Sequence, residues 1–477
     1  MPCLNVIKHS QTHHFSLGPI PYNEGTIQGT YGVLETIFME QFKLDPMAFN
    51  ERLWLVYGDQ KTASNIRSVI NERREASTAF DRHRWVLPLS SFFHLRQTFL
   101  WMLQALHFGS ENQNSPSTLY HNMNFWERKQ IPAIKGPFHH VEELILHSFE
   151  ARIIALLHVQ LREVNINIED SKAVEEYLTR MTVKEYLLLV DNIYQQAFSK
   201  DIQQPSTDSN HQDEEFRNHV RYLQQVETYA TLKYAIKHAD IGLIERVIDR
   251  CCIYFHGSKQ TNYAFEMLLF KRLLATGAAS VELKKAILVN GLVNLQGKED
   301  TSYEIDRLNE QLNLQLKEIL WARRTSTFGM DKLFRHCALT ASYCSTLKEY
   351  LESEFGEKTW AGHTEKAATA DIRDLAYEIS KRSIVKQPQG RKAVFKSPDI
   401  ITLGVRRLQE SAIDRFNARA TYSLGQVMSP EPDDGIDIHT PSTGGFSVAS
   451  QVIKCSTLYV FIKLTASSAQ CKVAFNA

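Results

Sequence analysis

The feature that most constrains the fold is a strand, turn and helix pattern that occurs twice near the start of the chain. The segment LWLVYGDQ begins at Leu53 with five residues suited to a buried strand and closes in a Gly-Asp turn signal. Residues 61–76 then place apolar side chains at helical spacing. Residues 84–109 repeat the order, with an expected turn at Pro88 to Ser91 and an amphipathic helix after it. Two such units predict a mixed α/β core.

The rest of the chain is dominated by helical periodicity. A helix is expected to begin near Tyr31, and from Pro137 onward apolar residues lie three and four apart over long spans. The fold class is therefore α/β and rich in α-helix. The boundaries drawn from these changes in character are an N-terminal extension at 1–30, the first part of the α/β core at 31–136, a helical insertion at 137–200, a flexible linker at 201–215, a helical region returning to the core at 216–427 and an irregular tail at 428–477. The tail is read either as part of the fold or as an appended segment, and both alternatives stay open.

Composition excludes several classes of protein. Lys+Arg 54 against Asp+Glu 54 gives no net charge, so any basic surface for nucleic acid must be local. Seven cysteines without a repeated CxxC spacing do not form a disulfide framework and favour a reducing compartment, nucleus or cytoplasm. The apolar windows are interrupted by charges before they reach the roughly 20 residues of a membrane helix. We therefore expect an intracellular protein that does not bind a membrane.

Asp59, directly after the first strand, is the leading candidate for chemistry. A carboxylate at the carboxyl end of a central strand projects into the crevice where α/β sheets place their sites. Carboxylate oxygens suit Mg²⁺ or Mn²⁺, and such ions can hold the attacking and leaving oxygens of a phosphodiester reaction. The alternative is a residue that caps the following helix. Spacing alone favours the cap.

Two further residues could complete a site with Asp59. His94 stands at the second strand-to-helix junction, although a His opening an amphipathic helix is more often a packed or capping residue. Glu266 lies in TNYAFEMLLF among apolar neighbours, so its carboxylate either faces solvent or projects into a site. The metal ligands predicted on this basis are Asp59 and Glu266.

Two weaker groups of polar residues accompany these candidates. Asp306, Glu310 and Asn313 share one face of an expected helix and form either a solvated face or a polar patch in the same crevice. Basic residues after the first strand are candidates for phosphate contacts, although charge runs are usually solvated. They are Arg67, Arg73 and Arg74.

Several short motifs resemble those of one family and occur in its order. They are NEGT near Asn23, GDQ-T from Gly58, FHLR-x-x-FL at Phe93, HHVEELILHSFEAR from His139, NYA-x-E at Asn262 and D-x-x-x-E-x-x-N at Asp306. Together they resemble a family of uncharacterised fungal proteins, DUF6589, over roughly residues 21–408. The family is itself similar to transposase-derived proteins. That resemblance implies a ribonuclease-H-like core with a large all-helical insertion before the last acid and a helical C-terminal part.

The resemblance also implies roles for single residues. Asp59 would be the first acid, Glu266 the last, and His94 would lie near the site; together they are the predicted catalytic residues. The position expected to hold a middle acid is Phe92, which removes charge that two cations require. The resemblance thus implies either weakened metal-dependent phosphodiester chemistry on DNA, with Mg²⁺ or Mn²⁺, or an inactive descendant that binds DNA. The competing class is a helical protein-interaction scaffold without catalysis, in which Asp59 caps a helix and Glu266 is a surface residue.

Overall fold

The computed structural model divides the chain into two compact units, each built from segments distant in the sequence. The first comprises residues 1–96, 232–360 and 401–477, and the second comprises 97–231 and 361–400. The residues that the structure describes are 4–14, 17, 20, 22–46, 52–128, 130–198, 212–275, 279–321, 368–382, 384–387, 390–412, 449–452 and 463–464. The linear boundaries drawn from composition stay a prediction.

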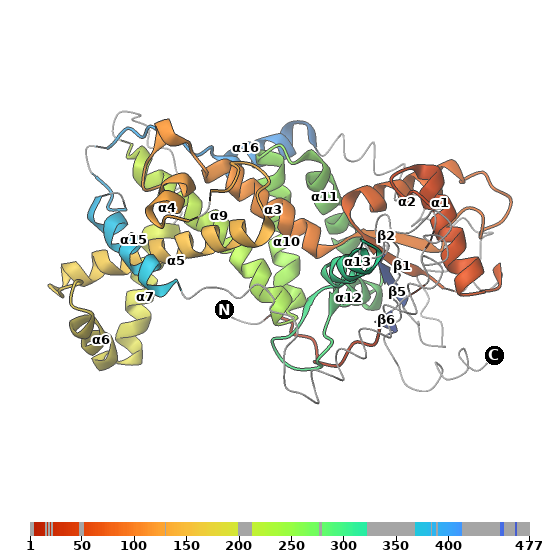
Figure 1. Ribbon diagram of the computed structural model, residues 1–477, viewed down its shortest axis with the longest axis horizontal. Helices are drawn as coiled ribbons and strands as arrows, with labels where there is room; N and C mark the ends of the chain where they lie inside the picture. The colour runs from red at the N-terminus through yellow and green to blue at the C-terminus, as the bar shows by residue number, and fades with distance from the viewer. Residues whose placement is uncertain are drawn as a thin grey trace. The chain divides into compact units, whose positions relative to one another are not determined.

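A small sheet organises the first unit (Figure 1). Strand β1 (Trp54–Gly58) pairs in parallel with β2 (Val86–Ser90), with Trp54 opposite Val86 and Gly58 opposite Ser90. On its other side β1 pairs in parallel with β5 (Ala449–Val452), which pairs antiparallel with β6 (Lys463–Leu464). Both predicted strands are confirmed. They pair in parallel because the helix after β1 returns the chain to the start of β2. The two tail strands join this sheet.

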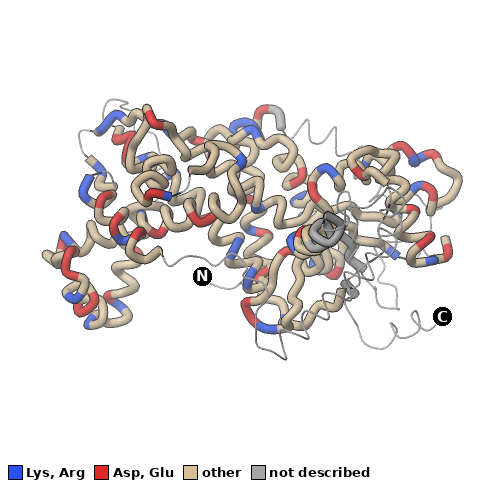
Figure 2. The backbone as a smooth tube through the Cα atoms, in the orientation of Figure 1, with Lys and Arg blue, Asp and Glu red and all other residues tan. Residues whose placement is uncertain are grey.

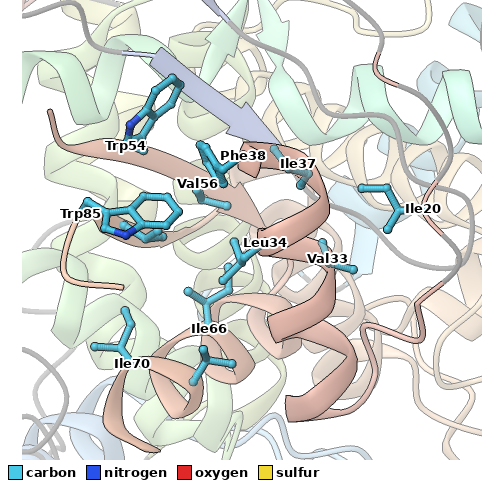
Figure 3. Close-up of a cluster of buried hydrophobic side chains, with 12 residues drawn as sticks. Ile20, Val33, Leu34, Ile37, Phe38, Trp54, Val56, Ile66, Ile70 and Trp85 are labelled. Atoms are coloured by element: carbon cyan, nitrogen blue, oxygen red, sulfur yellow. The ribbon is translucent and has the colours of Figure 1, made fainter. Parts of the chain in front are cut away.

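Helices and aromatic rings cover one face of β1. The covering elements are α1 (Ile27–Glu35), its π-helical continuation η1 (Thr36–Gln41) and α2 (Gln60–Glu72). Figure 3 shows their apolar side chains meeting Val56 and the two tryptophans of the strand region. Phe38 contacts Trp54 and Trp85 edge to face, with ring centroids 5.0 and 4.5 Å apart. The helix expected near Tyr31 begins earlier, because the side chain of Thr26 caps it by accepting from Gly29 N.

The other face of β1 is buried as well. The hydroxyl of Tyr57 donates to the carbonyl oxygen of Ile287 at 2.6 Å, and burial raises the pKa of Tyr57 well above its usual value. A strand covered on both faces reads as a continuous apolar run, which LWLVY is. The remaining elements of this unit are α10 (Ile241–Gly257), α11 (Thr261–Ala275), α12 (Val281–Asn290), the hairpin β3 (Leu292–Val293) and β4 (Tyr303–Glu304), α13 (Ile305–Trp321), α16 (Ile400–Arg407) and η5 (Leu408–Ala412).

The second unit is helical. It contains η3 (Glu111–Gln113), α4 (Leu119–Phe125), α5 (Phe138–Glu163), α6 (Ser171–Arg180), α7 (Val183–Phe198) and α15 (Thr369–Arg382). It also contains most of α3 (Phe92–His107) and of α9 (Glu214–Lys237). Leu156 of α5 and Leu375 of α15 belong to its apolar cluster. The α-rich α/β class is therefore confirmed, whereas the ribonuclease-H-like form of the core stays a prediction.

Among the described residues, one helix, α5, is long and apolar enough to cross a membrane by length and composition. However, 56% of that window is buried inside the protein, and α5 carries the fully buried Arg152. It therefore behaves as a core helix. Figure 2 shows basic and acidic residues dispersed along the described chain, without a long run of one sign.

Three expectations from the sequence need correction. Pro88 lies inside β2, not in a turn; β2 is an edge strand, so a residue without an N–H is tolerated there. Helix α9 begins at Glu214, inside the predicted linker, because Asp213 is buried and caps it by accepting from Phe216 N. The hairpin β3–β4 was not expected, since strands of two residues carry no periodicity. Residues 201–211 of the linker lie outside the described residues.

Candidate functional site

The candidate site begins where β1 ends. Asp59 follows Gly58 directly and has extended backbone angles, so it ends the strand and opens α2. One carboxylate oxygen, Oδ1, accepts from the backbone N–H of Thr62 at 2.8 Å. The capping alternative is therefore confirmed. Because the cap uses one oxygen and Asp59 is only half-buried, the second oxygen remains available to a ligand.

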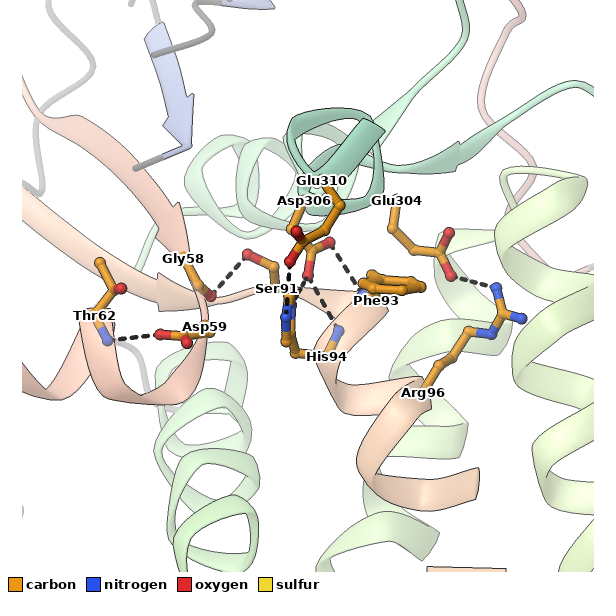
Figure 4. Close-up of polar contacts among 10 residues, drawn as sticks. All are labelled: Gly58, Asp59, Thr62, Ser91, Phe93, His94, Arg96, Glu304, Asp306 and Glu310. Carbon is orange, nitrogen blue, oxygen red and sulfur yellow. Dashed lines mark hydrogen bonds and ion pairs between the residues drawn. The ribbon is translucent and has the colours of Figure 1, made fainter. Parts of the chain in front are cut away.

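The end of β2 is tied to the end of β1 by Ser91. Its backbone N–H and its hydroxyl both donate to the carbonyl oxygen of Gly58, at 2.9 and 2.8 Å. This double contact places the start of α3 beside Asp59 (Figure 4). Both strand-to-helix junctions therefore meet at one edge of the sheet, as the parallel order requires.

Asp306, in the first turn of α13, binds the start of α3 from across the unit. Its carboxylate accepts from the backbone N–H groups of Phe93 and His94, both at 3.1 Å. These N–H groups have no partner within their own helix, and the positive end of the helix dipole favours a carboxylate there. Asp306 is fully buried, so the solvated-face alternative is wrong for it.

The same carboxylate holds the imidazole of His94. Nδ1 of His94 lies 2.8 Å from Oδ2 of Asp306, and Nε2 lies 3.4 Å from Oε1 of Glu310. The ring therefore presents Nδ1–H to a buried acceptor and Nε2 to a second carboxylate. The side chain of His94 is 14% exposed and that of Glu310 is 37% exposed, so the pair reaches solvent.

Two amide side chains on α13 are buried beside this group. Asn313, one of the predicted patch residues, is 3% exposed, and its Oδ1 has no hydrogen-bond partner among the described residues. The amide of Asn309 is fully buried, and within the same part of the chain neither of its atoms is paired. Asp306, Glu310 and Asn313 are spaced by four and three positions, so they share one face of α13. This face forms a strip of polar side chains that continues into the protein interior.

Glu266 lies in a separate buried contact in the same unit. Its Oε2 accepts from the hydroxyl of Ser90 at 2.7 Å, and its Oε1 forms a hydrogen-bonded ion pair with Arg67. Both partners are buried, so the surface-residue alternative for Glu266 is wrong. The carboxylate links α11 to the last residue of β2 and to α2.

The predicted phosphate-contact residues have different surroundings. Arg67 is buried against Glu266, so it does not present its guanidinium to solvent. The guanidinium of Arg73 lies over the ring of Tyr31, 4.4 Å from its centroid. Arg74 is exposed and pairs with Glu75 at 3.2 Å. Phosphate binding by these residues stays a prediction, and of the three only Arg74 is well exposed.

The described residues contain no group of three or more His, Cys, Asp and Glu side chains placed to hold a metal ion. The carboxylate oxygens of Glu266 accept from Arg67 and Ser90, and those of Asp306 accept from three N–H groups. Lone pairs on these oxygens are therefore already used in hydrogen bonds. Shared metal binding by Asp59 and Glu266 therefore stays a prediction, and hard oxygen donors at the site come from Asp59 and Glu310.

The sequence model of a family of unknown function, DUF6589, matches residues 1–363, about three quarters of the chain. The chain belongs to the DUF6589 family. Neither a curated protein nor a solved structure matches it. In this DUF6589 protein the matched region contains Asp59, His94 and Asp306, so the whole candidate site lies inside the family's own sequence.

Sequence reasoning found most of this group but missed how it is connected. It named His94 and Asp306 separately, and nothing local indicated that they bind each other across 212 positions. It assigned no contact to Ser90 or Ser91, and it did not name the buried ion pair of Arg96 with Glu304. A usable signal existed for Arg67, which occupies the apolar helix face of Ala63, Ile66 and Ile70, where a charge needs a buried partner.

Proposed function

We propose that the protein acts on phosphodiester bonds of nucleic acid, at the edge of the sheet where Asp59 and His94 lie. The observation that carries the proposal is the imidazole of His94 held between Asp306 and Glu310 beside the end of β1. Coupling a histidine to a buried carboxylate, with exposed carboxylates next to it, suits proton transfer and phosphoryl chemistry.

His94 is the acid–base group in this proposal. Asp306 accepts from Nδ1–H, so it sets the orientation of the ring. Nε2 then takes or gives the proton at the reacting oxygen. Asp306 is itself held by the two backbone N–H groups of α3, so its carboxylate is fixed where it accepts from the ring.

The hard oxygen donors of the site fit Mg²⁺ or Mn²⁺. Asp59, through its second oxygen, and Glu310 would hold the ion, and Asn313 offers a buried amide oxygen on the same face of α13 as Glu310. Magnesium sites commonly use one or two carboxylates plus substrate phosphate, which agrees with the small number of acids here. When bound, the ion would neutralise developing charge on the phosphate oxygens. Glu266 acts as a positioning residue through Ser90.

The choice of nucleic acid rests on the resemblance of the motifs to transposase-derived proteins. Lys and Arg equal Asp and Glu in number, and along the described chain the two signs are dispersed (Figure 2), so we expect substrate contacts to be few and close to the site. We therefore expect weak, salt-sensitive binding to DNA. A ribonuclease-H-like arrangement of the acids belongs to the same proposal.

A second candidate function is a protein-interaction scaffold without catalysis. One observation favours it: α7 exposes a row of large apolar side chains, including Val183, Leu187 and Tyr194. Exposed apolar rows of this kind usually mark a binding surface. The two functions are compatible, since the apolar row and the candidate site lie in different units.

The decisive experiment is Mn²⁺-dependent cleavage of labelled single- and double-stranded DNA by the purified full chain. We expect His94→Gln, Asp59→Asn and Glu310→Gln each to lower the rate at least about a hundredfold. Glu282→Gln is the matched control, because Glu282 is an exposed acid of the same unit. Full activity in the three site variants, or no cleavage by the folded wild type, would overturn the proposal. In the second case the scaffold function would be favoured.

A further inference from the structure

The exposed apolar row of α7 is independent of the proposed catalytic function. Val183, Leu187, Val190 and Tyr194 are all exposed large apolar residues, spaced by four, three and four positions. Alternating steps of three and four place side chains in one narrow seam along a helix, as in coiled coils. We call these four residues the α7 seam. An isolated exposed Leu is ordinary, but a continuous seam is not.

The seam continues the line of α7 that packs on the core. At its C-terminal end α7 packs on the second unit through Ile193, Ala197 and Phe198, which join the apolar cluster of α5 and α15. Gln224 of α9 donates to the carbonyl oxygen of Ala197 at 3.2 Å. Ala197 follows Tyr194 by three positions, so the four seam residues extend this anchored stripe toward the start of α7, where they are exposed.

The seam is held rigidly. At its start, Glu185 accepts from the N–H and hydroxyl of Thr182, both at 2.8 Å, while Glu185 N donates to that hydroxyl at 3.3 Å. This reciprocal capping box fixes the first turn of α7. At its end, the ring of Tyr194 stacks on Phe198, with centroids 4.9 Å apart. A surface that is already ordered loses little freedom on binding.

The charges beside the seam indicate which partner fits. Lys184 and Asp191 each follow a seam residue by one position, so both lie along the same side of it. Neither forms an ion pair within the described part of the chain. In an antiparallel pair of α7 helices, the residues on this side of each seam face one another. Lys184 of one copy then meets Asp191 of the other, twice, because of the two-fold axis.

We propose that α7 is a self-association surface through which two copies of this chain pair in antiparallel orientation. The two-fold axis passes between Leu187 and Val190. Leu187 of one copy therefore packs on Val190 of the other copy, and Val183 of one copy packs on Tyr194 of the other. A parallel arrangement brings neither lysine to an aspartate. Because the seam has only four residues, the interface is small, and the association is weak and transient.

Sedimentation velocity of the full chain across the micromolar range tests this. We expect a reversible monomer–dimer equilibrium, which Leu187→Glu weakens at least about tenfold. Leu188→Glu is the matched control: Leu188 and Leu187 are both 60% exposed, but successive helical residues point about 100° apart, so Leu188 lies off the seam. A chain that stays monomeric at every concentration, or equal effects of the two substitutions, would overturn the proposal.

A charge exchange tests the orientation separately. Lys184→Glu places two like-charged pairs across an antiparallel interface and should weaken the dimer by about tenfold. The double variant Lys184→Glu/Asp191→Lys restores both pairs and should return the dissociation constant close to that of the wild type. Both substitutions are at exposed positions, so circular dichroism should show unchanged helix content. Failure of the double variant to recover dimerisation would rule out the antiparallel pairing.

Discussion

At the scale of single residues, the ion pair of Arg67 with Glu266 explains why an acid stands among apolar neighbours in α11. Both groups are withdrawn from water, and the carboxylate of Glu266 meets Arg67 through one oxygen and Ser90 through the other. Apolar periodicity around Glu266 left open whether its carboxylate faces solvent or projects into a site, and it could not identify the partner, which is 199 positions away.

The pair should show strong coupling in a double-mutant cycle. Arg67→Met alone should lower the free energy of unfolding by about 3–5 kcal/mol, because it leaves a buried, unpaired carboxylate. Arg67→Met/Glu266→Met should cost clearly less than the sum of the single changes, since no charge is left unpaired. Urea unfolding followed by circular dichroism measures both. Additive losses, or a loss below about 1 kcal/mol for Arg67→Met, would show that the contact is not formed as described.

At the scale of elements, the start of α3 carries the site, and Phe92 has a clear structural role there. Its ring is buried, meets Phe270 at a centroid distance of 5.9 Å and fills the space beside Gly291. A side chain added at Gly291 would lie 2.5 Å from that ring, which explains the glycine. Phe92 therefore points into the core, a poor location for the middle acid implied by the resemblance.

We predict that Phe92→Asp destabilises the protein without creating a metal ligand. Losing the ring costs about 3–5 kcal/mol, and burying a carboxylate adds to this. Phe92→Ala isolates the packing loss, and Phe93→Ala, at a half-buried neighbour, should cost less. Thermal unfolding and Mn²⁺ titration calorimetry together decide the matter. A Phe92→Asp protein with wild-type stability and tighter Mn²⁺ binding would instead support a lost acid at this position.

Whether each of these elements could be predicted depended on the length of its pattern of apolar residues in the sequence. The run LWLVY is long enough and apolar enough to identify a strand buried on both faces, and Gly58-Asp59 marks its end. The two-residue strands β3 and β4 have no such signal, although their hairpin leads directly into Asp306. The contact of Asp306 with His94 depends on how this hairpin brings α13 to the start of α3. Local sequence patterns could therefore identify both residues as candidates but could not predict that they bind each other.

At the scale of the whole molecule, composition predicted a soluble, helix-rich chain without net charge, but not its division into discontinuous units. The second unit contains buried polar side chains, which the periodicity of apolar residues cannot predict. Arg152 is fully buried, donates to the carbonyl oxygens of Ser148 and Ser117, and lies 4.0 Å from the centroid of Tyr222. Its Nε also donates to Nδ1 of His219 at 3.2 Å.

The buried histidines beside Arg152 should make stability depend on pH. Burial lowers the pKa of His107 to about 3 and that of His219 well below its usual value. Both are therefore neutral in the folded chain, whereas the unfolded chain takes up protons below about pH 6.5. Their contribution is present above that pH and is lost as the pH falls, by about 1.4 kcal/mol per pH unit for each histidine.

Replacing one of these histidines by an amide should flatten this dependence. Between about pH 6.5 and pH 5, His107→Gln should lose about 2 kcal/mol less stability than the wild type, because one proton-accepting group is removed from the unfolded chain. Urea unfolding at several pH values measures the difference in slope, whatever the variant's stability at neutral pH. His139→Gln serves as the control, because His139 is an exposed histidine of the same unit. Equal dependence of unfolding free energy on pH in the wild type and in His107→Gln would mean that His107 is protonated in the folded chain. A carboxylate close to His107 would then be needed to stabilise that buried charge.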